Sequence, residues 1–215
     1  MSYPKSGRTW VRYALTQLGL DGAIHFHHDG FEFNDGSKPP HDFENDTRRL
    51  RYSETDKVVY LERDPRDVMV SLFFQITGRF DDFFGYRGTL SDFIHDEYFG
   101  AENLKGFRRI WRSLVQERKF HTISYEQCHE DMAGTLSRLL DYYELPVDPT
   151  GIKAAVAAAS FDRMKEVEQS GTFIHPWLRP RHGAPKVRAG LVGSHRTALS
   201  YADIAYLDEV FGPLG

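Results

Sequence analysis

Short apolar runs and helical repeats alternate along this chain. Residues 23–27, 58–61 and 120–125 are rich in apolar, β-branched or aromatic side chains, which is typical of buried strands. Elsewhere apolar residues recur three and four positions apart, as on one face of an amphipathic helix. The helical repeats are Val11/Leu15/Leu18 with Trp10 and Ala14 beside them, Leu104/Phe107/Trp111/Leu114, Met132/Leu136/Leu139/Leu140/Tyr143, 152–159 and Ile204/Leu207/Phe211. This alternation predicts a three-layer α/β fold, in which helices cover both faces of a parallel β-sheet.

Three further segments depart from this pattern. Residues 29–56 are polar, and we expect one helical stretch within them. Residues 72–101 are unusually aromatic, and the part from 80 to 86 mixes Phe and Tyr with Gly and Asp, which favours a loop that could line a pocket for a small molecule. Residues 168–199 read as a loop rich in Gly, Pro, Arg and His, long enough to carry function.

Length and composition narrow the class of protein. A chain of 215 residues suits one domain, which we expect to span residues 1–215. The net charge of −4 provides no general attraction to nucleic acid. No stretch has the length and hydrophobicity of a membrane span or a secretory signal, and the single Cys128 excludes an intrachain disulfide. We therefore expect a cytoplasmic protein without a membrane or nucleic-acid partner, and its oligomeric state stays open.

The segment from Tyr3 to Trp10 is the first candidate site. It reads Tyr-Pro-Lys-Ser-Gly-Arg-Thr-Trp and leads directly into the first amphipathic helix. Free N–H groups and the positive end of the helix dipole favour an anion in such a turn. Lys5 adds a full positive charge, and Ser6 and Thr9 add hydroxyl donors. Because the Gly-Lys-Ser/Thr ending of a Walker A loop is absent, we expect a phosphate loop of another kind.

A second candidate site follows the apolar run at residues 58–61. Arg63 stands at the carboxyl end of this predicted strand, where open α/β sheets bind their ligands. Asp64 and Pro65 are a good N-cap and first residue for the next helix. Ser71 lies two helical turns further on. These residues predict that a strand-to-helix turn presents Arg63 and Ser71 to an anionic ligand.

Together the two segments resemble the sulfotransferases that use 3′-phosphoadenosine-5′-phosphosulfate (PAPS). The segment from Pro4 to Trp10 is similar to the family's loop for the 5′-phosphosulfate, and the segment from Arg63 to Ser71 to its 3′-phosphate segment. A third match, from Arg188 through Ala189 and Gly190 to Gly193, resembles the family's basic loop. The resemblance implies the P-loop-NTPase-like sulfotransferase fold. Weaker similarities include Tyr125 within Ile-Ser-Tyr-Glu and Phe161 within Ser-Phe-Asp-Arg-Met.

The resemblance implies a reaction and a set of binding residues. A sulfuryl group would move from PAPS to a hydroxyl or amine of a small acceptor by in-line displacement, without a metal, and leave adenosine 3′,5′-bisphosphate (PAP). Lys5 would be catalytic, stabilising the leaving phosphate oxygen. The residues implied for the nucleotide are Lys5, Ser6, Gly7, Arg8, Thr9 and Trp10 at the 5′ end, Arg63, Ser71, Arg188, Ala189 and Gly190 at the 3′-phosphate, and Trp10, Tyr125 and Phe161 at the adenine.

The general base is sought in the segment after the first helix, which reads Ile-His-Phe-His-His-Asp from residue 24. The resemblance places the base at His28, and a register shift of one residue would place it at His27. The cytosolic branch of the family has a lysine two residues before its base, where this chain has Phe26. A metal site at these histidines is a weaker alternative, because no matching cluster of ligands follows.

Two functions of other classes stay open at this point. An ATP-dependent small-molecule kinase on a related fold should carry a Gly-Lys-Ser/Thr loop and acidic magnesium ligands, and this chain shows neither clearly. A degenerate nucleotide-binding protein without turnover is the second alternative. It is favoured by Phe26 and by the short segment before the loop. Only Met1 and Ser2 precede Tyr3, so we expect the family's first strand to be very short here or partly missing from this chain.

Overall fold

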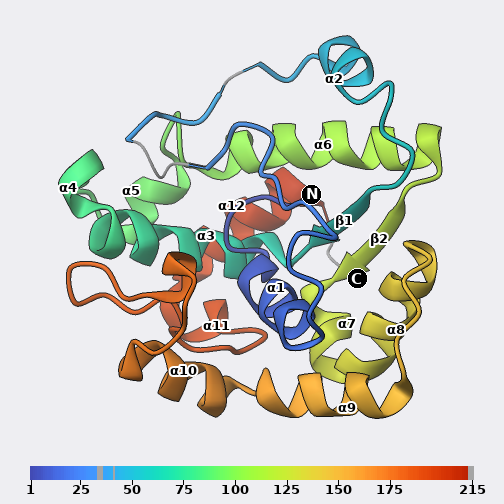
Figure 1. The fold of residues 1–215 in the computed structure, drawn as a ribbon. Coiled ribbons are helices and arrows are strands. Elements are labelled where there is room, and N and C mark those ends of the chain that lie inside the picture. The colour runs from blue at the N-terminus through green and yellow to red at the C-terminus, as the bar shows by residue number, and fades with distance from the viewer. Residues whose placement is uncertain (33–35, 41, 213–215) are drawn as a thin grey trace.

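The computed structural model of the chain describes residues 1–32, 36–40 and 42–212, and Figure 1 shows its ribbon. Helices dominate and surround a small sheet. In chain order the elements are α1 (Arg8–Gln17), α2 (Asn45–Arg51), β1 (Val59–Glu62), α3 (Pro65–Phe74), the π-helix η1 (Gln75–Arg79), α4 (Asp81–Phe84), α5 (Leu90–Ile94), α6 (Ala101–Arg118), β2 (His121–Ser124), α7 (Tyr125–Glu130), α8 (Met132–Tyr142), α9 (Pro149–Ala158), α10 (Phe161–Ser170), the 3-10 helix η2 (Pro176–Leu178), α11 (His195–Ala198) and α12 (Tyr201–Phe211).

The sheet is parallel, as the sequence predicted. Strands β1 and β2 pair from Val59 opposite His121 to Glu62 opposite Ser124. A single parallel bridge between Ser2 and Leu61 adds the N-terminal residues on the other side of β1. The described residues thus form a two-stranded sheet with one additional bridge.

Successive side chains of β1 point to opposite faces of the sheet and enter two separate cores. Tyr60 belongs to the core formed with α3, α5, α6 and α12, whereas Val59 and Leu61 belong to the core formed with α1, α8 and α9. In Figure 1, α6 lies on one face of the strands and α1 lies on the other. This arrangement confirms the layered α/β prediction.

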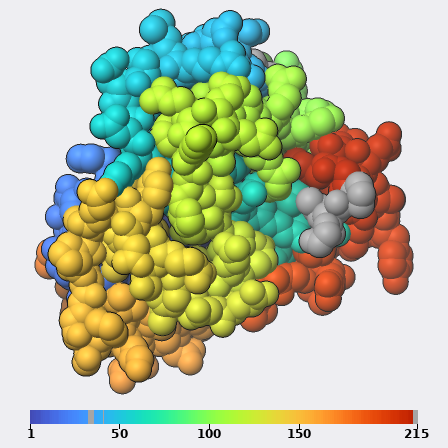
Figure 2. All heavy atoms as spheres, turned by 90° about the vertical axis from the view of Figure 1, so that its right-hand side faces the viewer, coloured from blue at the N-terminus to red at the C-terminus, as the bar shows by residue number. Residues whose placement is uncertain are grey.

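Helices also close the side of the molecule next to β2. Figure 2 shows that side chains of the segment from α6 to α9, yellow-green to orange, cover most of this face. Above them lies α2, which is tied to the body of the protein through a buried carboxylate. Asp29, 4% exposed, accepts hydrogen bonds from Arg48 Nε at 3.1 Å, Arg51 Nη1 at 2.8 Å, Tyr52 Oη at 2.8 Å and Trp111 Nε1 at 3.3 Å.

Most helix predictions are confirmed, and local chemistry explains their ends. Asp64 caps α3 by accepting the N–H of Arg66 at 2.9 Å, with Pro65 as the first helical residue. Ser200 and Asp203 form a capping box at the start of α12. The helical stretch expected within residues 29–56 is α2.

Three sequence predictions are wrong in detail. Residues 23–27 are not a strand. The His27 carbonyl accepts one bond from the N–H of Ser2, which is too little for a ladder, and most of the five side chains are exposed. Residues 80–86 are not all loop, since α4 occupies Asp81–Phe84. Residues 168–199 are not one long loop: α10 continues to Ser170, and η2 and α11 interrupt the rest.

Asp29 provides a test of how α2 is held. Asp29→Asn should lower the free energy of unfolding by about 3 kcal/mol, because the nearly inaccessible Arg48 loses its buried charge partner. Asparagine tolerates the left-handed backbone at this position (φ 55°), so the charge is the main change. Denaturant titration measures the effect.

The matched control is Asp46→Asn, which removes an exposed partner of Arg49 on the same helix and should leave the unfolding midpoint near that of the parent. Equal losses of unfolding free energy in the two variants would show that the burial of Asp29 does not determine its contribution to stability.

Candidate functional site

A cavity of about 450 Å³ opens at the carboxyl end of β1. Its walls come from the loop before α1, from His28 and Glu32, from α3 and η1, and from α7, α10 and the segment between η2 and α11. The lining residues are Pro4, Lys5, Gly7, Arg8, Thr9, Trp10, His28, Glu32, Arg63, Ser71, Gln75, Arg79, Phe80, Tyr125, His129, Phe161, Met164, Trp177, Arg181, Lys186, Val187, Arg188, Ala189 and Gly190.

The loop before α1 has the backbone of an anion site. Lys5 and Gly7 both have positive φ angles, 72° and 101°, and such turns gather N–H groups into a concave surface. No side chain caps the helix at Gly7, so the first N–H groups of α1 remain available to a ligand. A Cβ atom at Gly7 would lie 2.4 Å from the ring of Tyr125, which explains why glycine is required here.

Arg63 is held in place by contacts with three parts of the chain. Its guanidinium donates to Lys5 O at 3.2 Å and to Leu191 O at 2.9 Å, and it lies 4.1 Å from the centre of the Tyr125 ring. Asp67, one turn further along α3, is 3.5 Å away. Arg63 is 8% exposed, so these contacts fix its side chain at the cavity wall.

One face of α3 and η1 continues the wall. Ser71, Gln75 and Arg79 are spaced by four residues, and all three line the cavity. Arg79 donates from Nη1 to the carbonyls of Arg179 at 2.9 Å and Ala184 at 3.3 Å. These bonds dock the segment before the basic loop onto the π-helix.

The basic loop is joined to α3 by Asp67, which is fully buried. Its carboxylate accepts hydrogen bonds from Gly193 N at 2.8 Å, Ser194 Oγ at 3.1 Å, His195 N at 2.9 Å and His195 Nδ1 at 3.0 Å. Bonds from His195, with the charge of Arg63, hold the pKa of Asp67 below its ordinary value against the effect of burial. The carboxylate therefore stays charged and keeps the loop close to Arg63.

The same loop approaches an aromatic side chain closely. A Cβ atom at Gly190, whose φ is 63°, would lie 2.4 Å from Phe161 Cδ2. The preceding Arg188 is exposed towards solvent and lies 4.6 Å from the centre of the Phe74 ring. Glycine thus lets the basic loop pass directly over the first residue of α10.

Aromatic rings form another part of the wall. The indole of Trp10 donates from Nε1 to Ala159 O at 2.7 Å, which fixes its orientation. Its ring meets Tyr125 edge-on at 5.7 Å and His129 at 4.9 Å. With Phe161 these rings offer flat apolar surface next to the cationic loops, as a nucleotide base requires.

The lysines of the cavity have strongly perturbed pKa values. Burial, with the charges of Lys186 and Arg79, holds the pKa of Lys5 well below its ordinary value. Burial, with Arg79 and Arg8, lowers the pKa of Lys186 to about 7, and Glu168 opposes this shift. These shifts show that positive charge is concentrated here without a matching anion from the protein.

His28 and His27 differ in their surroundings. His28 is 7% exposed and lines the cavity, whereas His27 is exposed and does not. The Nδ1 atom of His28 lies 2.6 Å from the carbonyl oxygen of Ser2. A carbonyl only accepts, so Nδ1 carries the hydrogen and Nε2 keeps its lone pair. Burial, with Arg8, holds the pKa of His28 well below its ordinary value, which keeps the ring neutral.

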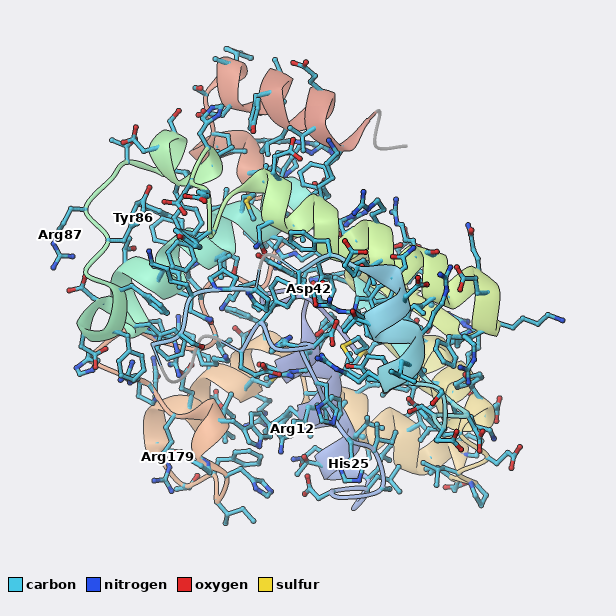
Figure 3. All side chains as sticks on the ribbon, turned by 90° about the horizontal axis from the view of Figure 1, so that it is seen from above. Arg12, His25, Asp42, Tyr86, Arg87 and Arg179 are labelled. Atoms are coloured by element: carbon cyan, nitrogen blue, oxygen red, sulfur yellow. The ribbon has the colours of Figure 1, made fainter. Side chains whose placement is uncertain are left out.

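The structure brings nearly all of the residues implied by the resemblance into this one cavity. Ser6 is the exception: it is buried, and its N–H donates to Tyr3 O at 3.3 Å. Of the aromatic stretch at residues 80–86, Phe80 lines the cavity, but Tyr86 does not. Figure 3 shows Tyr86 and Arg87 at the edge of the molecule, far from Arg12 on α1.

Several lining residues were missed by sequence reasoning. Gln75 and Arg79 could have been found by extending the spacing of four residues from Ser71. Lys186 lies two residues before Arg188 in the same loop, a weaker signal. His129 and Glu32 carry no sequence signal of their own. Within the described ranges, no group of three or more His, Cys, Asp or Glu is placed to hold a metal ion, and no helix is long and apolar enough to cross a membrane.

Comparison with known proteins agrees with this geometry. Residues 1–214 match the family described as the sulfotransferase domain. Mouse sulfotransferase 2B1 is 27% identical over 166 residues, which are 74% of this chain and 48% of the relative. Human sulfotransferase 2B1 is 28% identical over 74% of this chain and 44% of its own length. This chain thus spans about half the length of these curated relatives.

Solved structures share the fold. Mouse sulfotransferase SULT7A1 complexed with PAP superposes with a TM-score of 0.71 at 18% identity, covering 98% of this chain and 80% of that protein. Retinol dehydratase in complex with androsterone and the inactive cofactor PAP gives a TM-score of 0.64 at 18% identity, over 97% of this chain and 77% of that protein. With a family match that runs from residue 1 to residue 214, this chain belongs to the sulfotransferase domain family.

Proposed function

We propose that this protein transfers a sulfuryl group from PAPS to a hydroxyl or amine of a small acceptor. The observation that carries the proposal is the convergence of three separate segments on one cavity: the anion loop with Lys5, the strand end with Arg63, and the basic loop with Arg188. PAPS carries negative groups at both ends of its ribose, so a site for it needs cations at two places.

The 5′ end of PAPS would bind in the loop before α1. N–H groups at the start of a helix and the Lys5 ammonium suit the phosphosulfate. Gly7, Arg8 and Thr9 line the same part of the cavity. As the bond between sulfur and the bridging oxygen breaks, charge builds up on the departing phosphate, and Lys5 would stabilise it.

The 3′-phosphate would bind between Arg63, Ser71 and Arg188. The two guanidiniums can each donate two parallel hydrogen bonds to a phosphate, and the Ser71 hydroxyl can donate one more. The Leu191 carbonyl already joins the basic loop to Arg63, so both sides of this subsite are held before the ligand arrives. Ala189 and Gly190 add backbone to the same wall.

The adenine would lie on the aromatic part of the wall. Trp10, Tyr125 and Phe161 line the cavity, and the close approach of Gly190 to Phe161 leaves no room for a side chain there. Stacking on such rings is independent of charge, so it would orient the base while the arginines bind the phosphates.

The acceptor would bind near His28. Its Nε2 atom has a free lone pair and can accept the proton of an acceptor hydroxyl or amine as sulfur is attacked. Retinol dehydratase, which has this fold, was solved with the small molecule androsterone. We propose that the acceptor is likewise a small molecule, which would share the cavity with PAPS next to His28.

The 3′-phosphate subsite gives the first test of this function. PAP should bind far more tightly than AMP, because AMP lacks the 3′-phosphate. Arg63→Ala and Arg188→Ala should each weaken PAP binding by about 10- to 150-fold and leave AMP binding nearly unchanged, as one charged hydrogen-bonding group is lost in each. Calorimetric titration of both nucleotides measures the preference.

The control is Arg163→Ala, which removes an exposed arginine of α10 that pairs with Glu166 away from the cavity. It should keep the parent's preference for PAP. Equal affinity of the parent for PAP and AMP would contradict the sulfotransferase function itself.

The base assignment gives a second test. His28→Ala should lose about 100- to 10,000-fold in kcat, because general-base catalysis is removed, yet bind PAP normally. His27→Ala is the matched control and should stay active, since His27 faces solvent. If His27→Ala is inactive and His28→Ala is active, the base lies one residue earlier.

The pH dependence follows from the surroundings of His28. Because burial and Arg8 lower the pKa of His28, the ring stays neutral and able to accept a proton as pH falls through 6.5. The acidic limb of the kcat/KM profile should therefore lie below pH 6.5. An acidic limb above that value would contradict a buried, neutral base.

A further inference from the structure

Two lysines from distant segments enter the cavity without a protein partner. Lys5 lies in the loop before α1, and Lys186 lies in the segment that leads to the basic loop. Across the described parts of the chain, neither ammonium has a hydrogen bond or an ion pair, in contrast to Arg181, which pairs with Asp82 at 2.8 Å. The role of Lys5 follows from its loop, whereas nothing so far assigns one to Lys186.

Lys186 lines the same cavity as Lys5 and His28. Lys186 is the charged neighbour that lowers the pKa of Lys5 most strongly. Its charge also lowers the pKa of His28. Since the three residues share one cavity, a ligand bound there can contact the phosphate-stabilising lysine, the candidate base and Lys186 together.

The backbone of Lys186 is fixed independently of its side chain. Glu168, 3% exposed on α10, accepts the N–H groups of Lys186 and, at 2.8 Å, Val187. Arg79 holds the same segment through the Ala184 carbonyl. Because the scaffold uses main-chain bonds, the Lys186 ammonium is left free for a ligand.

The positive charges of Lys5 and Lys186 favour the binding of an anion beside them. Lys5 and Lys186 repel each other, and desolvation in the cavity wall adds to that cost. A site that keeps two unpaired cations together is preorganised for negative charge, which is the usual source of electrostatic catalysis. Arg63 and Arg188 belong to the proposed 3′-phosphate subsite, so the 3′-phosphate is not the anion expected beside Lys5 and Lys186.

We propose that Lys186 is a second catalytic lysine, whose ammonium binds the sulfuryl oxygens of PAPS beside Lys5 and His28. The inference rests on the proposed function. The acceptor oxygen or nitrogen forms a bond to sulfur, the bond from sulfur to the bridging phosphate oxygen breaks, and PAP leaves with that electron pair. His28 Nε2 takes the acceptor's proton. Lys186 keeps its protons and holds the three oxygens of the group in transfer.

The variants Lys186→Met and Lys186→Arg test this role. Lys186→Met should lower kcat by about 100- to 1,000-fold, the usual effect of removing one preorganised donor to a developing charge. Its affinity for PAP should change only a few-fold, because PAP has no sulfuryl group. Lys186→Arg should recover part of the rate, since it restores the charge. The control Lys153→Met removes an exposed lysine of α9 and should match the parent.

Proton uptake gives a readout that does not depend on turnover. The pKa of Lys186 is lowered to about 7 in the free protein, and an anion beside it should raise that pKa, so that binding takes up protons. Calorimetry at pH 8 in two buffers of different ionisation enthalpy should show more protons taken up with PAPS than with PAP in the absence of acceptor. Lys186→Met should abolish the difference.

The outcomes separate this inference from the function on which it rests. If the parent prefers PAP to AMP but Lys186→Met keeps kcat within a few-fold, Lys186 does not bind the sulfuryl group. The same conclusion follows if Lys186→Met loses PAP affinity as strongly as it loses rate, or if Lys186→Arg is no better than Lys186→Met. If the parent shows no preference for PAP, the sulfotransferase function is wrong.

Discussion

The carboxylate of Asp67 joins the two halves of the cavity. It lies on the first turn of α3, four residues after Arg63, and accepts four hydrogen bonds from residues 193–195. Together with the bond from Arg63 to the Leu191 carbonyl, these contacts hold the basic loop, which carries Arg188, against the strand-to-helix turn. A fully buried carboxylate is tolerated because every bond it accepts compensates the desolvation of its charge.

The same principle recurs at Glu168, which positions Lys186, and at Asp29, which positions α2. In each case a buried acidic side chain binds backbone or guanidinium groups from a distant segment. The acidic residues serve as structural anchors, and the cavity they frame is left with unpaired positive charge. A protein with a net charge of −4 can therefore carry a strongly cationic site.

The proposed chemistry depends on this separation of roles. Burial, with neighbouring positive charges, lowers the pKa values of Lys5 and Lys186. In the proposed function, the anion that would balance these charges belongs to the ligand. His28 is kept neutral by burial among the same cations, so the feature that attracts PAPS also keeps the base ready to accept a proton. In the proposed function, one electrostatic environment would thus serve both nucleotide binding and acceptor activation.

The sequence by itself determined the local elements and the identity of the site. The apolar run before Arg63 predicted β1, and the Asp64–Pro65 pair predicted the start of α3, because each signal acts over a few neighbouring residues. Signals of this kind depend only on neighbouring residues, so they can be recognised in the sequence. Gly7 and Gly190 lie inside matches to a known family, and the structure places each of them against an aromatic ring.

Only the tertiary structure decided how distant groups meet. Residues 23–27 have the composition of a strand, yet they begin in a turn and only the His27 carbonyl accepts a bond from Ser2, so no strand forms. Lys186 has only a weak local signal, its place two residues before Arg188. The role proposed for it depends on Glu168, Lys5 and His28, which lie 18 to more than 150 positions away in the sequence. His27 and His28 are neighbours of the same type, and burial alone separates them. Desolvation and long-range electrostatic effects depend on which segments pack together, and this packing cannot be predicted from a local sequence pattern.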